Sequence, residues 1–228
     1  MFDLDVRQRL TELADPKLRD FSARLTPTST KIMGVKVPDI RMLAREIVRG
    51  DWQEYLGRAS EEYLEERMLK GIVITYAKTD FEQKLSLMRD FLPLIDNWAV
   101  CDSVVLGFKD VKKHLSRTYE FLTPYFSATD EFSLRFAVVM LLSYFVTDDY
   151  VDTVLHVCNH IRHDGYYAKM AVAWALSVCF VKYRDKTLAL FYNNRLDDFT
   201  LNKALQKSIE SYRVTPQDKT LLRGIKRK

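Results

Sequence analysis

The sequence predicts an all-α protein, built as a helical-repeat solenoid in which pairs of helices stack into a curved α–α superhelix. Apolar residues recur at helical spacing along most of the 228 residues. Strongly helical segments begin about every 33 to 36 residues, with a second helix between them, as in repeat arrays. Only 7 glycines and 6 prolines are present, too few for the many turns of an all-β fold.

Capping residues and prolines mark several helix beginnings. These signals are Asp15 before Pro16, Val37 before Pro38, Ser60 before Glu61 and Glu62, and Thr129 and Asp130 before Glu131. The strongest helical segments cover residues 61–78, 97–108, 131–145, 166–183 and 199–212. The second helices cover residues 81–95, 112–126 and 148–161. Because such repeats share one core, we expect a single domain over residues 1–228, with a concave face formed by the same helix of every repeat.

Net charge, cysteine content and the length of the apolar runs indicate which classes of protein fit the sequence. The net charge of +4 is compatible with a nucleic-acid surface but far below that of a histone-like protein. Three cysteines without a CxxC pair, and a charged start without a signal-peptide core, predict a reduced, cytoplasmic protein. The longest apolar run, residues 136–146, is too short to cross a bilayer. We expect a monomer without a cofactor, a bound metal or a membrane partner.

A few polar or aromatic residues interrupt the apolar repeat helices. In "NWAVCDSVV", Trp98 and Asp102 are four residues apart and therefore share one helix face. Arg135 is the only charged residue between Glu131 and Asp148. In "AKMAVAWALSVCF", Lys169 is the only charged residue and Trp174 the only large aromatic before Phe180.

Two interpretations of these residues stay open at this level. In the structural one, Asp102 and Arg135 form a buried ion pair and the tryptophans belong to the core, because lone buried charges are costly. In the functional one, they line the concave surface. A carboxylate there stabilises positive charge developing on a sugar, indole faces hold a cationic ring, and Arg135 and Lys169 hold phosphates.

The ordered set of Trp98, Asp102, Arg135 and Trp174 is similar to that of the AlkD-type DNA alkylation repair family, the HEAT-like-repeat DNA glycosylases that remove cationic alkylated purines. "FSARL…IMGVKVPDIRMLAREI" and "AKMAVAWAL" add to the resemblance, which runs from about residue 10 to 212. It implies duplex DNA as the partner and Asp102 as the catalytic carboxylate. Trp98 and Trp174 would flank the damaged nucleotide, and Arg135 would hold a phosphate.

The chain departs from the family pattern in two places. "RLTPTSTKIMG", residues 24–34, is helical in active members, but Pro27 and the surrounding hydroxyl residues predict a loop here. No aromatic residue lies between Phe21 and Trp52, and no basic residue follows Trp174 in "ALSVCF". These losses weaken contact with DNA and leave Asp102 untouched. They predict a divergent paralogue that lacks the DNA-probing helix, with weak or absent base excision.

Other functions are compatible with the same sequence. An active DNA glycosylase acting on 3-methyladenine or 7-methylguanine is the main alternative, and a solenoid that binds a protein partner is the general one for repeat folds. His156, His160 and His163 are spaced as one helical stripe that could in principle bind a metal, but no fourth ligand follows. We expect these histidines to lie on the surface.

Overall fold

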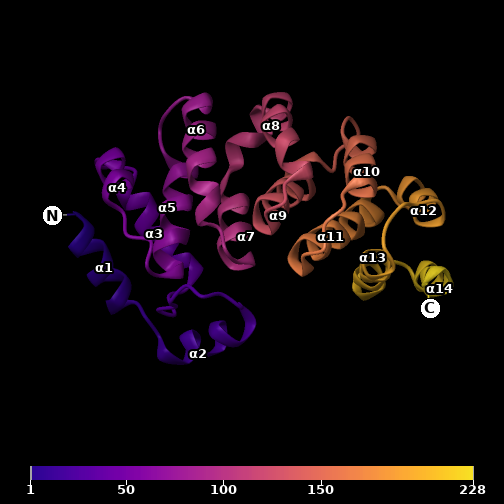
Figure 1. The fold of residues 1–228 in the computed structure, drawn as a ribbon, viewed down its shortest axis with the longest axis horizontal. Helices are drawn as coiled ribbons and strands as arrows, with labels where there is room; N and C mark the ends of the chain where they lie inside the picture. Colours follow the sequence, from indigo (N-terminus) through magenta and orange to yellow (C-terminus); the bar gives the residue numbers. More distant parts are fainter. Residues whose placement is uncertain (1, 228) are drawn as a thin grey trace. The chain divides into compact units, whose positions relative to one another are not determined.

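A computed structural model describes residues 2–227 of the chain, and within that range it contains fourteen α-helices and no β-strand (Figure 1). The fold is therefore all-α, as predicted. The chain divides into two compact units, Met1–His114 and Leu115–Lys228, each of which is described by itself. The prediction of a single domain stays a prediction.

The first unit is built around three stacked helices. Its α-helices are α1 (Phe2–Glu12), α2 (Pro16–Leu25), α3 (Val37–Ile47), α4 (Trp52–Arg58), α5 (Leu64–Tyr76), α6 (Phe81–Phe91) and α7 (Trp98–Gly107), with 3-10 turns η1 (Leu92–Leu94) and η2 (Lys109–Lys113). Helix α5 packs against both α3 and α7, while α6 covers α5. This arrangement gives the unit one layer of α3, α5 and α7 and a second layer that includes α6.

The second unit repeats this organisation. Its helices are α8 (Leu115–Leu122), α9 (Glu131–Met140), α10 (Val151–His160), α11 (Tyr166–Lys182), α12 (Arg184–Tyr192), α13 (Asp198–Glu210) and α14 (Pro216–Ile225), with a 3-10 turn η3 (Thr123–Ser127) and a π-helical turn η4 (Leu141–Phe145). Helix α11 packs between α9 and α13, and α10 contacts both α11 and α12.

The predicted period is present. The helices α5, α7, α9, α11 and α13 begin at Leu64, Trp98, Glu131, Tyr166 and Asp198, which is one every 32 to 35 residues. Of these helices, α5, α11 and α13 each contact a shorter helix that follows in the chain, namely α6, α12 and α14. The chain is therefore a helical-repeat protein, because one supersecondary unit recurs and stacks on its neighbour.

The beginnings of α2, α3 and α9 agree with the predicted signals. Asp15 and Asp130 cap α2 and α9 with their side chains, and α3 begins at Val37. The signal at Ser60 was wrong, since α5 begins only at Leu64. The Ser60 hydroxyl instead accepts a hydrogen bond from Arg7. The Glu66 carboxylate takes over the capping role by accepting the Tyr63 backbone N–H at 3.0 Å.

Close helix contact in the first unit depends on one glycine. A Cβ atom at Gly71 of α5 would lie 2.4 Å from Val104 of α7 and 2.7 Å from the Phe91 ring of α6. Both neighbours are fully buried. The absence of a side chain at Gly71 therefore lets α5 lie close to both α6 and α7.

The three cysteines lie in the cores. Cys101, Cys158 and Cys179 are fully buried and reduced. Burial, with a smaller contribution from Cys179, holds the pKa of the Cys158 thiol well above its ordinary value. Burial likewise raises the pKa of Cys179 to about 12.

Among the described helices, none combines the length and apolar character needed to span a bilayer.

Candidate functional site

Helix α7 presents Trp98 and Asp102 along one edge. The buried Asn97 caps the helix by accepting the Val100 N–H at 3.0 Å, so that Trp98 is the first helical residue. Trp98 and Asp102 are both partly exposed, whereas the opposite face, with Val100, Cys101, Val104 and Val105, is buried. This placement argues against a purely core role for either side chain.

The indole of Trp98 is held by the end of α2. Its Nε1–H donates to the carbonyl oxygen of Leu25 at 3.1 Å. Leu25 is the last residue of α2, and the chain leaves the helix there. The hydrogen bond therefore couples the orientation of the indole ring to the position of α2.

The loop that follows α2 is also fastened to the start of α7. Residues 26–36 are not helical, so the loop predicted for residues 24–34 is present from residue 26, while Arg24 and Leu25 still belong to α2. The hydroxyls of Thr28 and Thr30 donate to one carboxylate oxygen of Asp96 at 2.7 and 2.5 Å. Arg67 of α5 lies 3.3 Å from the same oxygen. Asp96 lies two residues before Trp98, so the loop and the indole share one support.

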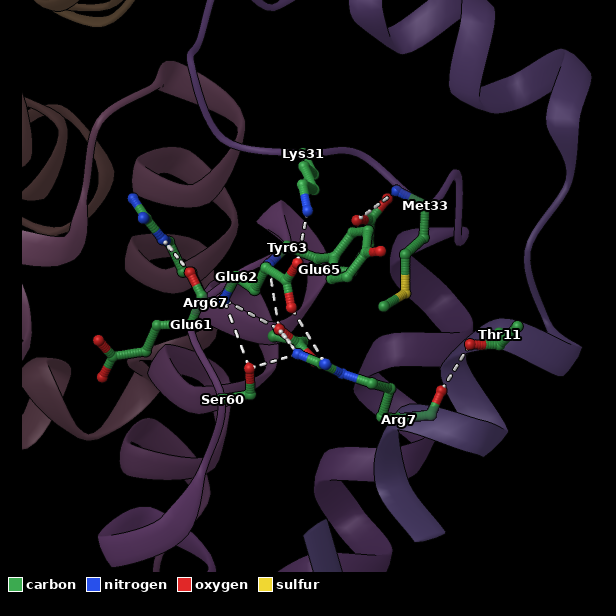
Figure 2. Close-up of polar contacts among 11 residues, drawn as sticks. Arg7, Thr11, Lys31, Met33, Ser60, Glu61, Glu62, Tyr63, Glu65 and Arg67 are labelled. Atoms are coloured by element: carbon green, nitrogen blue, oxygen red, sulfur yellow. Dashed lines mark hydrogen bonds and ion pairs between the residues drawn. The ribbon is translucent and has the colours of Figure 1, made fainter. Parts of the chain in front are cut away.

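A second carboxylate holds the far end of this loop (Figure 2). Glu65 of α5 is 2% exposed and accepts the backbone N–H groups of Met33, Gly34 and Val35 at 2.9, 2.7 and 3.2 Å. The backbone N–H of Leu64 donates to the carbonyl of Lys31 at 2.8 Å. We name residues 26–36 the anchored loop, because hydrogen bonds to α5 and to the residues before α7 fix both halves.

Acid should loosen the anchored loop. Burial alone would raise the pKa of Asp96, but hydrogen bonds from Thr30, Thr28 and Asn97 and the charge of Arg67 outweigh it, and the pKa lies below its ordinary value. A carboxyl with a lowered folded-state pKa stabilises the fold above its unfolded pKa, near about 4. That stability is lost as the pH falls through the lower folded-state value.

Denaturant unfolding of the wild type and of Asp96→Asn checks this pH dependence. We expect the stability difference between the two proteins to be largest at pH 6 and to shrink toward pH 3, where the wild-type carboxyl takes up its proton. A difference of equal size at both pH values would contradict a stabilising role for the ionised form.

The helix that active relatives carry in residues 24–34 does not continue beyond Leu25, but the helix predicted to begin after Asp15 directly precedes this segment. Helix α2 directly precedes the anchored loop and contributes no buried residue to the core. It stands apart from α3, α5 and α7 (Figure 1). Phe21 and Leu25, one helical turn apart, are 52% and 51% exposed, and Arg24 is exposed beside them. The chain therefore carries a short surface helix with apolar and basic side chains.

In the second unit, Arg135 of α9 lies inside. It is only 6% exposed, its guanidinium donates to the carbonyl of Tyr167 at 3.0 Å, and it lies 6.0 Å from the centre of the Tyr167 ring. This position suits the support of the α9–α11 contact. The phosphate-binding role implied by the resemblance stays a prediction.

Lys169 of α11 faces carboxylates. Its ammonium lies 3.9 Å from Asp164 and 3.8 Å from Asp197. The Asp197 carboxylate also caps α13 by accepting the Thr200 N–H at 3.0 Å. Lys169 therefore has two acidic neighbours that would compete with a phosphate for its charge.

Trp174 of α11 lines an open hollow of about 290 Å³ against α13. The other lining residues are Ser177, Val178, Val181, Lys207, Glu210, Ser211 and Arg213. Lys207 and Arg213 were not among the residues selected from the sequence. Trp174 is the ninth residue of α11 and Lys207 the tenth of α13, so comparing equivalent positions one repeat further along the chain would have found Lys207.

The histidines do not form the predicted stripe. Helix α10 ends at His160, so His163 lies beyond it. His163 instead accepts the Gly165 N–H with Nδ1, which leaves Nε2–H to donate to the Thr129 carbonyl at 3.0 Å. His156 and His160 are exposed on α10, with ring centres 4.2 Å apart. Within the described residues, no group of three or more potential ligand side chains is placed to hold a metal.

These features define a class of protein, a helical-repeat array that displays tryptophans and a carboxylate on its stacked helices. The chain belongs to the DNA alkylation repair enzyme family, whose model matches residues 6–207, nearly its whole length. No curated protein sequence matches the chain.

Proposed function

We propose that the protein binds duplex DNA through α7 in the first unit and α11 in the second, and that its base-excision activity is weak or absent. The observation that carries the DNA-binding part is the partial exposure of Trp98, Asp102 and Trp174 on helices whose other faces are buried. Indole faces and cations together suit a nucleotide backbone and its bases. Membership of the family supports the same partner.

The electrostatic chemistry of alkylpurine excision needs a carboxylate beside the sugar. As an N-glycosidic bond breaks, positive charge develops on the sugar carbon, and a fixed carboxylate stabilises that charge. A cationic alkylpurine is already a good leaving group, so a modest stabiliser suffices. Asp102, partly exposed one turn from Trp98, is the residue placed for this role.

Two side chains that excision would draw on are already engaged within the protein, which supports weak activity. The Trp98 N–H is bound to the Leu25 carbonyl, and Arg135 is buried against Tyr167. Neither group is presented to a phosphate in this conformation. Loss of such positioning contacts lowers the rate even where the catalytic group is kept, because the reacting atoms are aligned less well.

The alternative is an active DNA glycosylase, and α2 is the observation that favours it. Its exposed Phe21, Arg24 and Leu25 offer apolar and basic contacts directly before the anchored loop. Because the Trp98 N–H donates to the last residue of α2, DNA contacts made by α2 would change the orientation of the indole ring.

Single-turnover release of 7-methylguanine tests the proposed activity. Protein in excess over a methylated duplex is expected to release no base above the spontaneous background, both as wild type and as Asp102→Asn. Heated, depurinated duplex serves as the positive control for detection. Release by the wild type that disappears in Asp102→Asn would replace our proposal with the active glycosylase.

Binding is measured separately by fluorescence anisotropy with undamaged and methylated duplexes. We expect similar affinities for the two and a steep dependence on salt. For three neutralised phosphates, affinity should fall about 40-fold between 50 and 200 mM salt. Binding that does not change with salt would favour the protein-partner function of repeat folds over a DNA partner.

A further inference from the structure

The hollow beside Trp174 combines an apolar wall with two cations. Val178 and Val181 extend the wall along α11 from Trp174. Lys207 comes from the last turn of α13, and Arg213 from the turn between α13 and α14. All of these residues belong to the second unit.

Lys207 and Arg213 differ from the two cations selected from the sequence. Arg135 is buried and Lys169 faces two carboxylates, whereas no ion pair joins Lys207 or Arg213 to any residue that the structure describes. Glu210 is the acidic residue of the hollow, and its carboxylate accepts a hydrogen bond from the Gln206 amide at 2.8 Å. The hollow therefore carries more positive than negative side-chain charge.

The polar groups of the hollow leave donors available for an anion. The Ser211 hydroxyl accepts the Arg213 backbone N–H at 3.3 Å, which leaves its own proton to donate. Ser177, by contrast, already donates to the Trp174 carbonyl at 2.8 Å. Beside the hollow in sequence, the side chain of Tyr212 is fully exposed. Exposed aromatic rings next to cations are typical of surfaces that hold nucleotides.

We propose that Lys207, Ser211 and Arg213 bind a phosphate of the DNA backbone, while Trp174 and the two valines contact the adjoining sugar. This subsite rests on the proposed function. It consists of the residues through which the second unit would bind the nucleic acid. Lys supplies a point charge to phosphate and Arg a fork of donors, so both side chains suit the same anion.

A purely local role for the two cations makes a different prediction. Cations in the last turn of a helix stabilise it by countering its negative C-terminal dipole. If Lys207 and Arg213 did only this for α13, replacing them would lower thermal stability without changing nucleic-acid binding. The subsite predicts a change in binding and in its salt dependence.

The test compares the double variant Lys207→Gln/Arg213→Gln with Lys186→Gln in duplex binding across a salt series. Lys186 lies on α12 and pairs with Asp152, so its replacement removes charge away from the hollow. We expect the double variant to bind about 10-fold more weakly and its salt slope to fall by about 1 to 2. Glu210→Gln should tighten binding. A double variant that binds like Lys186→Gln would overturn the subsite.

A second measurement separates failure of the subsite from failure of the proposed function. Titration with a thymidine tetranucleotide is followed by the backbone amide resonances of Ser211, Tyr212 and Arg213. We expect shifts in the wild type that are lost in the double variant. Shifts without duplex binding would keep the subsite and overturn the proposed function. Duplex binding without shifts at these residues would keep the function and overturn the subsite, and absence of both would overturn both.

Discussion

Replacing Glu65 with alanine is expected to lower the free energy of unfolding by about 3 to 5 kcal/mol. The carboxylate is buried and accepts the backbone N–H groups of Met33, Gly34 and Val35. A buried donor left without a partner costs about 1 to 3 kcal/mol, and three donors are released together. Denaturant unfolding measures the loss, and hydrogen exchange of these three amides shows whether it arises in the anchored loop.

Two further variants serve as controls for the effect of Glu65→Ala. Glu62→Ala removes a carboxylate that pairs with Lys31 and Arg7 but is 42% exposed, so it should be much less destabilising than Glu65→Ala. Glu65→Gln keeps one acceptor oxygen and should fall between the two alanine variants. If Glu62→Ala and Glu65→Ala were equally destabilising, the three backbone hydrogen bonds would not be what holds the loop.

Gly34→Ala should have an effect of similar size for a different reason. Gly34 has φ of +92°, where a side chain is strained by about 1 to 2 kcal/mol. Its Cβ would also lie 2.5 Å from the carbonyl oxygen of Asp15 and 2.6 Å from the backbone nitrogen of Arg19. Because these are backbone atoms at the start of α2, the helix and the loop must separate, and we expect a loss of about 2 to 5 kcal/mol.

Limited proteolysis reports where the Gly34→Ala chain opens. Cleavage should increase within residues 15–34 before it increases elsewhere. Gly57→Ala is the matched control, since a Cβ there meets no atom within 4 Å and alanine favours the helical conformation of α4. It should be neutral or stabilising by up to about 1 kcal/mol. A Gly34→Ala protein as stable as Gly57→Ala would contradict the close contact between the loop and α2.

The repeat fold could be predicted because each core helix shows the spacing of apolar residues along its own sequence. Apolar spacing identified α5, α7, α9, α11 and α13 to within a few residues, since each buries a continuous face. The start of α5 was misplaced because Glu66 caps it at Tyr63, while the Ser60 hydroxyl is taken up by the distant Arg7. Helix α2 was underrated, although Asp15 and Pro16 marked its start, because a helix that buries nothing has no core pattern to reveal it.

The candidate site was predictable in part. Spacing alone placed Trp98 and Asp102 on one edge of α7. Spacing could not show whether that edge faces the core or the solvent, because the apolar residues of α7 are compatible with both orientations. Nor could spacing show that Arg135 is buried, or that Lys207 and Arg213 lie beside Trp174. Those facts depend on how one repeat packs against the next.

The placement of the cysteines bears on how the protein withstands its chemical surroundings. Thiols react with electrophiles as thiolates, and reaction requires contact with the reagent. Cys101, Cys158 and Cys179 are all shielded, and the raised pKa values of the latter two keep them protonated at neutral pH. Methylating agents that modify DNA bases therefore find none of these sulfur nucleophiles accessible in the folded chain. The fold protects its own thiols under the conditions in which its family is needed.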